Sequence, residues 1–198
     1  ASNGQLDVMF PMASEAAEIS AARAVLRGAL EQAEAVGAAP AKVRVGVAIE
    51  TPSLVWQGEI ALRRVDFATI GTNDLLQFAF AADRDGVRMS ERYDAISPPA
   101  LAMLRHVVQS AKRANTPLSV CGEMASDPLA AIALIGLGVR RLSVAPAAVK
   151  PIRAVAANVD AAEAAVLIEE LIGSEEHSVR DQVREFAESA DIPIDEQY

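Results

Sequence analysis

The sequence has little cysteine and little positive charge. Cys121 is the single cysteine among 198 residues, which excludes an internal disulfide and fits the reducing cytoplasm, where we expect the protein to act. Lys and Arg number 18 against 27 Asp and Glu, and the formal net charge of −9 argues against general binding to nucleic-acid backbones. No apolar run reaches the roughly 20 residues of a membrane helix, so we expect no membrane segment and no secretory leader.

The hydrophobic content of 52% predicts one α/β domain with a real core. Short apolar runs that alternate with helical patterns predict a parallel sheet of about five strands. The strands are expected at residues 6–10, 43–49, 65–70, 118–121 and 141–145. Helices are expected at about 15–36, 52–62, 75–81, 98–114, 127–137, 147–156, 160–172 and 175–189.

Local signals mark several of these helices. Ala22, Val25, Leu26, Ala29 and Ala33 form an apolar stripe along the first. Thr51 before Pro52, Asp127 before Pro128 and Asp160 before Glu163 are typical of helix starts.

Polar side chains follow three of the expected strands. Glu50 comes directly after the second strand, Gly71, Thr72, Asn73 and Asp74 follow the third, and Cys121 ends the fourth. Ligands of α/β folds bind at the carboxyl ends of strands, so we expect these groups to share one site. Taken alone, Gly, Asn and Asp also make ordinary turns for backbone reasons.

Two of these carboxylates suit a hard metal ion. Glu50 and Asp74 lie at the ends of consecutive strands, and Mg²⁺ commonly takes one or two protein carboxylates together with phosphate oxygens. Arg84 follows ten residues later and could clamp a phosphoryl group with two hydrogen bonds. The alternatives are a pair of solvated loop acids and a surface ion pair of Arg84 with Asp83 or Asp85.

Cys121 is the candidate acid. An ordinary thiol, with a pKa of about 8.5, is mostly protonated at neutral pH and can donate a proton. The alternatives are that Cys121 is a small buried hydrophobic residue, or that Glu123 is the acid.

Together the motifs resemble the phosphoenolpyruvate (PEP)-binding barrel of enzyme I of the bacterial phosphotransferase system, in a group that includes pyruvate phosphate dikinase and PEP synthase. The similar segments are 45–52 (VGVAIETP), 70–77 (IGTNDLLQ) with Asp83 and Arg84, 121–125 (CGEMA) and 9–12 (MFPM). Residues 77–84 (QFAFAADR) look closer to the nitrogen-regulatory paralogue. The sequence departs from the family after Arg84, where Asp85 and Gly86 replace the common Gly-Asn.

The resemblance implies a TIM-type (β/α)8 barrel of which this chain holds a part, strands four to eight, in residues 1–172. A five-stranded doubly wound sheet is the structural alternative. Residues 173–198 would form a C-terminal helix and tail. The resemblance also implies that Glu50 and Asp74 bind Mg²⁺ and that Gly71, Thr72, Asn73 and Arg84 bind PEP. Cys121 would be the acid that protonates the enolate to give pyruvate. The phosphoryl group would pass to a histidine on a separate domain and then to a small phosphocarrier protein.

We therefore expect the PEP-binding part of a PEP–protein phosphotransferase, homodimeric in the intact enzyme and inactive as this chain alone. A fragment of a dikinase or synthase is one alternative, and a non-catalytic dimerisation or sensory module is another. Whether the protein serves sugar transport or nitrogen regulation stays open.

Overall fold

The computed structural model describes residues 4–82 and 93–194, and these residues fold around a parallel sheet of four strands. The strands lie in chain order, so each pairs with the one that follows it in the sequence. They are β1 (Gln5–Phe10), β2 (Lys42–Ile49), β3 (Phe67–Gly71) and β4 (Leu118–Cys121). Helices supply the crossovers that parallel neighbours require. The first four predicted strands are confirmed, each to within two residues.

The fifth strand predicted at residues 141–145 is wrong: in the described chain this segment forms no strand. Leu142 makes a single parallel bridge to Val120, held by two backbone hydrogen bonds of 3.0 and 2.8 Å. Further along, the Ala145 N–H donates to the Ser126 hydroxyl at 3.2 Å instead of to the sheet. The ladder stops after one bridge because a side chain takes the backbone group that a strand would use.

Helices follow every strand. They are α1 (Ala16–Ala35), α2 (Pro52–Trp56), α3 (Gly58–Leu62), α4 (Thr72–Phe80), α5 (Pro98–Ala114), α6 (Glu123–Ser126), α7 (Pro128–Gly136), the 3-10 helix η1 (Pro146–Ala148), α8 (Val149–Asn158), α9 (Ala161–Ile172) and α10 (Arg180–Ser189). The predicted helix at 52–62 is divided at Gln57, α6 was not predicted, and α10 begins later than expected. None of the described helices combines the length and apolar character needed to cross a bilayer.

The predicted helix starts carry side-chain caps. Thr51 accepts the Leu54 N–H, and the Asp127 carboxylate accepts two N–H groups at the start of α7. Asp160 does the same at the start of α9, with bonds of 2.7 and 3.1 Å. These caps satisfy backbone donors that have no partner inside the helix, and they fix where each helix begins.

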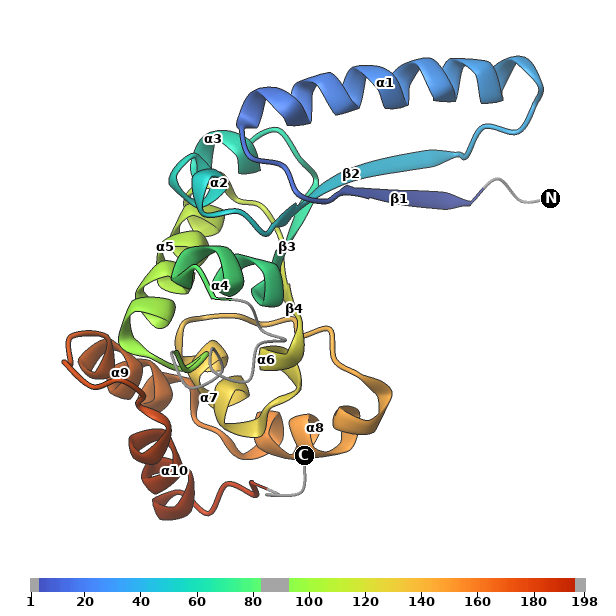
Figure 1. Cartoon of the computed structure of the whole chain (residues 1–198). Coiled ribbons are helices and arrows are strands. Elements are labelled where there is room, and N and C mark those ends of the chain that lie inside the picture. The colour runs from blue at the N-terminus through green and yellow to red at the C-terminus, as the bar shows by residue number, and fades with distance from the viewer. Residues whose placement is uncertain (1–3, 83–92, 195–198) are drawn as a thin grey trace.

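One buried core joins the sheet to the helices that cover it (Figure 1). Ile49, Ile70 and Val120 contribute from three adjacent strands and are fully buried. Helix α7 is buried along residues 128–134, as expected for a helix that is apolar on all sides. Helix α10 adds Val183 to the same core.

Helix α1 and the adjoining parts of β1 and β2 extend away from the rest of the chain (Figure 1). Ala16 and Ile19 are the buried residues of α1, while Val25 in the predicted apolar stripe is 76% exposed. The pattern predicts the helix correctly, but the described residues cover its stripe only in part: Ala22, Leu26 and Ala33 are half-buried, and Ala29 is exposed like Val25.

Gly136 lets α7 and α9 pack at very short range. A Cβ atom at this position would lie 2.7 Å from the Ala164 carbonyl oxygen and 2.9 Å from a side-chain atom of Ile168. Both contacts are closer than van der Waals packing allows, and the nearest is with backbone. The packing of α7 against α9 therefore requires glycine at position 136.

We predict that Gly136→Ala lowers the free energy of unfolding by about 1–3 kcal/mol, because the added methyl overpacks the contact between α7 and α9. Gly28→Ala in α1 is the matched control: a Cβ there meets nothing within 4 Å, so better helix propensity should stabilise by about 0.5–1 kcal/mol. Urea unfolding measures both. Stabilisation by both variants would contradict the packing argument.

Candidate functional site

The carboxyl ends of β2, β3 and β4 meet at one edge of the sheet. Gly71 at the end of β3 is the register partner of Cys121 at the end of β4, and Ile49 of β2 pairs with Ile70. Glu50 therefore follows its strand at the level where Gly71 follows Ile70. The structure brings together the predicted groups of all three strand ends.

Glu50 is held in place from both sides. Its Oε2 accepts the Met12 N–H at 2.9 Å, from the turn after β1. On the other side its chain lies against Gly71, where a Cβ would come within 2.6 Å of Glu50 Cγ and 2.7 Å of Oε1. Met12 adopts a left-handed φ of 54°, which is uncommon for a residue with a side chain. Glycine at 71 leaves room for the carboxylate beside β3.

The segment after β3 forms the first turn of α4. Thr72 is fully buried and its hydroxyl donates to the Cys121 carbonyl at 2.8 Å. Asn73 accepts the Glu123 N–H on its Oδ1 at 3.0 Å. Asp74 is half-buried, and its carboxylate forms no hydrogen bond or ion pair with any described residue. One member of the motif is thus left unpaired at the site.

Gly122 is required where these two strand ends meet. Its φ of +103° lies in the region that side chains rarely adopt. A Cβ would also lie 2.4 Å from the Thr72 hydroxyl and 2.7 Å from Asn73 Oδ1. The glycine thus serves both the backbone turn and the close approach of the β3 end.

Cys121 lies half-buried beside the two acids. Its Sγ donates to the Ile70 carbonyl at 3.5 Å. Burial raises the pKa of the Cys121 thiol, and the negative charges of Glu50 and Asp74 raise it further. The thiol therefore keeps its proton at neutral pH, as a proton donor must.

A cavity of about 810 Å³ opens beside Cys121. Asn73, Gly122 and Glu123 line it on the side of the predicted motifs, and the Arg180 side chain lines it from α10. Glu50 and Asp74 are not among the described residues that line this cavity. The open volume therefore lies on the Asn73 side of the thiol.

Arg180 is a residue of this cavity that sequence reasoning missed. Its guanidinium binds Asp94 through two nitrogens, at 2.9 and 3.0 Å, and Asp127 through a third at 2.7 Å. Burial alone would lower the pKa of Arg180, but the bonds to Asp94 and Asp127 outweigh it and raise that pKa. Ser178 also donates to Asp94 at 2.8 Å. The cluster fastens the start of α10 to the cavity wall.

The donor set fits a magnesium ion better than a softer metal. No group of three His, Cys, Asp or Glu side chains in residues 4–82 and 93–194 is arranged to hold a metal. Two carboxylates are nonetheless available at one strand edge, and Asp74 has no partner among the described residues. Mg²⁺ is commonly held by one or two carboxylates with substrate phosphate and water completing its shell.

Arg84, the predicted phosphate ligand, lies outside the described residues together with Asp83 and Asp85. Its role stays a prediction. Glu123, the alternative acid, is exposed at the start of α6 and lines the same cavity as Cys121.

Comparison with known families matches most of this chain to one family. Residues 1–161 match the family model described as PEP-utilising enzyme, PEP-binding domain. The chain therefore belongs to the family of PEP-binding domains of PEP-utilising enzymes.

Curated relatives narrow the resemblance to phosphotransferases, as the sequence motifs predict. The chain is 35% identical over 190 residues to a protein named phosphoenolpyruvate-dependent phosphotransferase system from Salmonella typhimurium, covering 95% of this chain and 25% of that protein. It is 37% identical over 155 residues to the phosphoenolpyruvate-protein phosphotransferase of Bacillus sp. (strain S), covering 76% and 26%. It is 42% identical over 151 residues to the multiphosphoryl transfer protein of Rhodobacter capsulatus, covering 76% and 18%. The chain thus spans about a quarter or less of the length of these relatives.

The fold is similar to part of a solved pyruvate kinase from Cryptosporidium parvum, with a TM-score of 0.52 at 9% identity. The alignment covers 72% of this chain and 27% of that structure. At this identity the likeness concerns the fold alone. It supports the predicted α/β class with a parallel sheet.

We predict that alkylation of Cys121 by iodoacetamide in metal-free buffer has a pH midpoint above the ordinary thiol value of about 8.5. Glu50→Gln should lower this midpoint because one of the charges that raise the pKa is removed. Glu34→Gln in α1 removes the same charge far from the thiol and should leave the midpoint unchanged. Since Cys121 is the single cysteine, the label reports on one site. Equal midpoints in all three proteins would contradict the proximity of acid and thiol.

Proposed function

We propose that this chain is the PEP-binding part of a PEP–protein phosphotransferase, with Mg²⁺ held by Glu50 and Asp74. The observation that carries the proposal is the convergence of two carboxylates and a protonated thiol at the ends of three adjacent strands. Membership of the PEP-binding family and the phosphotransferase relatives support it.

We propose separate roles for the residues of the site. Asn73 and the Gly71 and Thr72 backbone bind the substrate's phosphate or carboxylate, and Arg84 binds the transferring phosphoryl group. Glu50 and Asp74 would hold a Mg²⁺ ion, which would neutralise negative charge on the phosphate. In the described chain no Lys or Arg side chain forms an ion pair with Glu50 or Asp74, so a bound divalent ion would balance their negative charge.

Cys121 supplies the proton that completes pyruvate. When the phosphorus–oxygen bond of PEP breaks, the electron pair stays on the substrate as an enolate, and the phosphoryl group leaves for a histidine acceptor. The thiol then transfers its proton to the methylene carbon of the enolate, which gives pyruvate and a thiolate that solvent reprotonates. A raised thiol pKa keeps the donor protonated until the enolate forms.

The acceptor histidine belongs to a separate domain in this proposal, and a small phosphocarrier protein receives the phosphoryl group afterwards. The intact enzyme would be a cytoplasmic homodimer. The described chain offers an uncovered edge on β1, where Leu6 and Met9 are 42% and 43% exposed, and an open strand edge favours association.

Calorimetry tests the metal and substrate roles. We predict that the chain binds PEP weakly and in a Mg²⁺-dependent manner, and that Glu50→Gln and Asp74→Asn each weaken this binding by at least about tenfold. Glu123→Gln is the matched control, since it removes an exposed carboxylate of the same region that holds no metal in the proposal. Magnesium-independent binding, or equal loss in the control, would argue against the assigned ligands.

Turnover should be absent from this chain alone. We predict no pyruvate release when PEP and Mg²⁺ are added, because the histidine that accepts the phosphoryl group lies elsewhere in the proposed enzyme. An assay coupled to lactate dehydrogenase measures pyruvate directly. Release of pyruvate together with phosphorylation of the chain would show that this chain alone transfers the phosphoryl group, and would contradict the prediction.

A further inference from the structure

Arg180 joins three separate parts of the chain at the wall of the cavity beside Cys121. It begins α10, and its side chain is 33% exposed. Its Nε and Nη2 donate to the Asp94 carboxylate at 3.0 and 2.9 Å, and its Nη1 donates to Asp127 at 2.7 Å. Two carboxylates from different segments therefore fix the plane of the guanidinium group.

Further contacts hold the start of α10 in place. The Val179 N–H donates to the Ile96 carbonyl at 3.1 Å, and the Ser178 hydroxyl donates to Asp94 at 2.8 Å. Val183 packs into the common core, and α10 contacts α7. The Arg180 side chain thus reaches the cavity wall from a support that is itself fixed.

Asp127 uses its two carboxylate oxygens for two different contacts. Oδ1 accepts the Leu129 and Ala130 N–H groups at 2.9 and 3.3 Å, which begins α7. Oδ2 accepts the Arg180 Nη1. The cap needs only one of the oxygens, so the bond to Arg180 adds a second constraint. It ties the junction of α6 and α7 to α10.

Helix α6 connects this junction to Asn73. It consists of the four residues Glu123–Ser126, a single turn that internal hydrogen bonds alone hardly stabilise. At its first residue the Glu123 N–H donates to Asn73 Oδ1 at 3.0 Å. Directly after its last residue comes Asp127, which Arg180 holds. The turn is therefore fastened at both ends by side chains.

The bond from Glu123 sets the orientation of the Asn73 side chain. A backbone N–H can be accepted only by the amide oxygen, so the two N–H donors of the Asn73 amide point away from Glu123. Asn73 lines the cavity. In this orientation it can donate to the phosphate or carboxylate of a substrate, whereas the flipped amide would present its oxygen and repel an anion.

We infer that Arg180 is a positioning residue of the site, which holds α6 through Asp127 so that Glu123 orients the Asn73 amide. Arg180 lies beyond residue 161, where the match to the PEP-binding family ends. A segment outside the matched domain would thus complete the cavity. The consequence for PEP rests on the proposed function, in which Asn73 contacts the substrate.

The charges around Arg180 favour positioning over direct binding of substrate. Arg180 is the one cation among the described residues that line the cavity. Its one positive charge faces the two negative charges of Asp94 and Asp127, which leaves the cluster with a net charge of −1. Such a cluster does not attract an anion. Partly buried ion pairs often add little net stability, and their contribution here is to geometry.

NMR of the chain without metal or PEP tests the inference. In Arg180→Gln we expect the Glu123 amide proton signal to move to lower frequency and its hydrogen exchange to become roughly tenfold faster, the typical effect of losing one hydrogen bond. The Met12 N–H binds Glu50 on the other side of the site and should be unaffected. An unchanged Glu123 signal, or equal acceleration at both amides, would overturn the inference.

Arg105→Gln is the matched control. Arg105 is 32% exposed and forms an ion pair with Glu169 that joins α5 to α9. Its loss should leave the Glu123 signal unchanged, and an equal shift in both arginine variants would refute a specific role. Asp94→Asn serves if Arg180→Gln does not fold: it weakens the support of Arg180, so a smaller shift of the same sign is expected. No shift in the folded Asp94→Asn protein would overturn the inference.

Calorimetry then measures the consequence for the proposed function. Arg180→Gln should weaken Mg²⁺-dependent PEP binding roughly tenfold, and Arg105→Gln should leave it unchanged. If the unaltered chain does not bind PEP, the proposed function fails, while the NMR result on Glu123 still decides the role of Arg180. If the unaltered chain binds PEP and Arg180→Gln binds it equally well, the inference fails and the proposed function stands.

Discussion

The site depends on the hydrogen bonds that join the end of β3 to the end of β4. Gly71 and Cys121 are register partners, the buried Thr72 hydroxyl binds the Cys121 carbonyl, and Asn73 binds the Glu123 N–H. Only a glycine at position 122 allows this approach, for both conformational and steric reasons. Two segments almost fifty residues apart are thereby fixed to each other at the point where the thiol, the amide and the acids meet.

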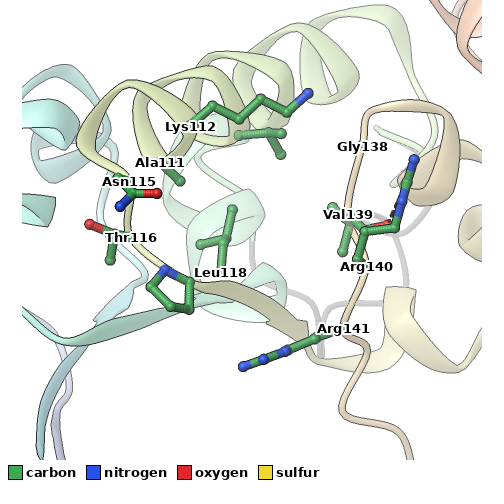
Figure 2. A pocket seen from close by; sticks show the side chains of 11 residues that line it. Ala111, Lys112, Asn115, Thr116, Leu118, Gly138, Val139, Arg140 and Arg141 are labelled. Carbon is green, nitrogen blue, oxygen red and sulfur yellow. Dashed lines mark hydrogen bonds between the residues drawn. The ribbon is translucent and has the colours of Figure 1, made fainter.

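Charge is distributed unevenly along β4. At its carboxyl end the acids Glu50 and Asp74 raise the pKa of the Cys121 thiol. At its amino end Lys112, Arg140 and Arg141 line a pocket whose described lining residues include no Asp or Glu (Figure 2). An anionic substrate would be repelled by the acidic end unless a cation came with it. The metal dependence that we propose would therefore follow from the local charges as well as from the family resemblance.

Local sequence signals predicted much of this arrangement. The short apolar runs at 43–49 and 118–121 predicted β2 and β4. The positions of Glu50, Asp74 and Cys121 at or just after the ends of their strands predicted that they share one edge. The segment 141–145 looks equally strand-like, but pairing depends on which partner takes its backbone groups, and Ser126 takes one of them. A single sequence does not reveal that competition.

Arg180 shows a second limit of the sequence. Its partners Asp127 and Asp94 lie 53 and 86 residues away, and no motif in a charged helix distinguishes it from its neighbours. Likewise, the stripe of α1 predicts a helix but not whether anything covers it, since coverage is a property of the whole assembly.

The site is built from β2, β3 and β4, and the uncovered edge of the sheet belongs to β1. The contacts that orient Glu50, Thr72, Asn73 and Cys121 all come from the described chain itself. Whatever covers β1 would therefore add stability and further ligands without having to create the first carboxylates or the thiol. In the proposed function, binding and transfer can for this reason be separated: the chain positions the acids and the proposed proton donor, and the phosphoryl acceptor would approach from elsewhere.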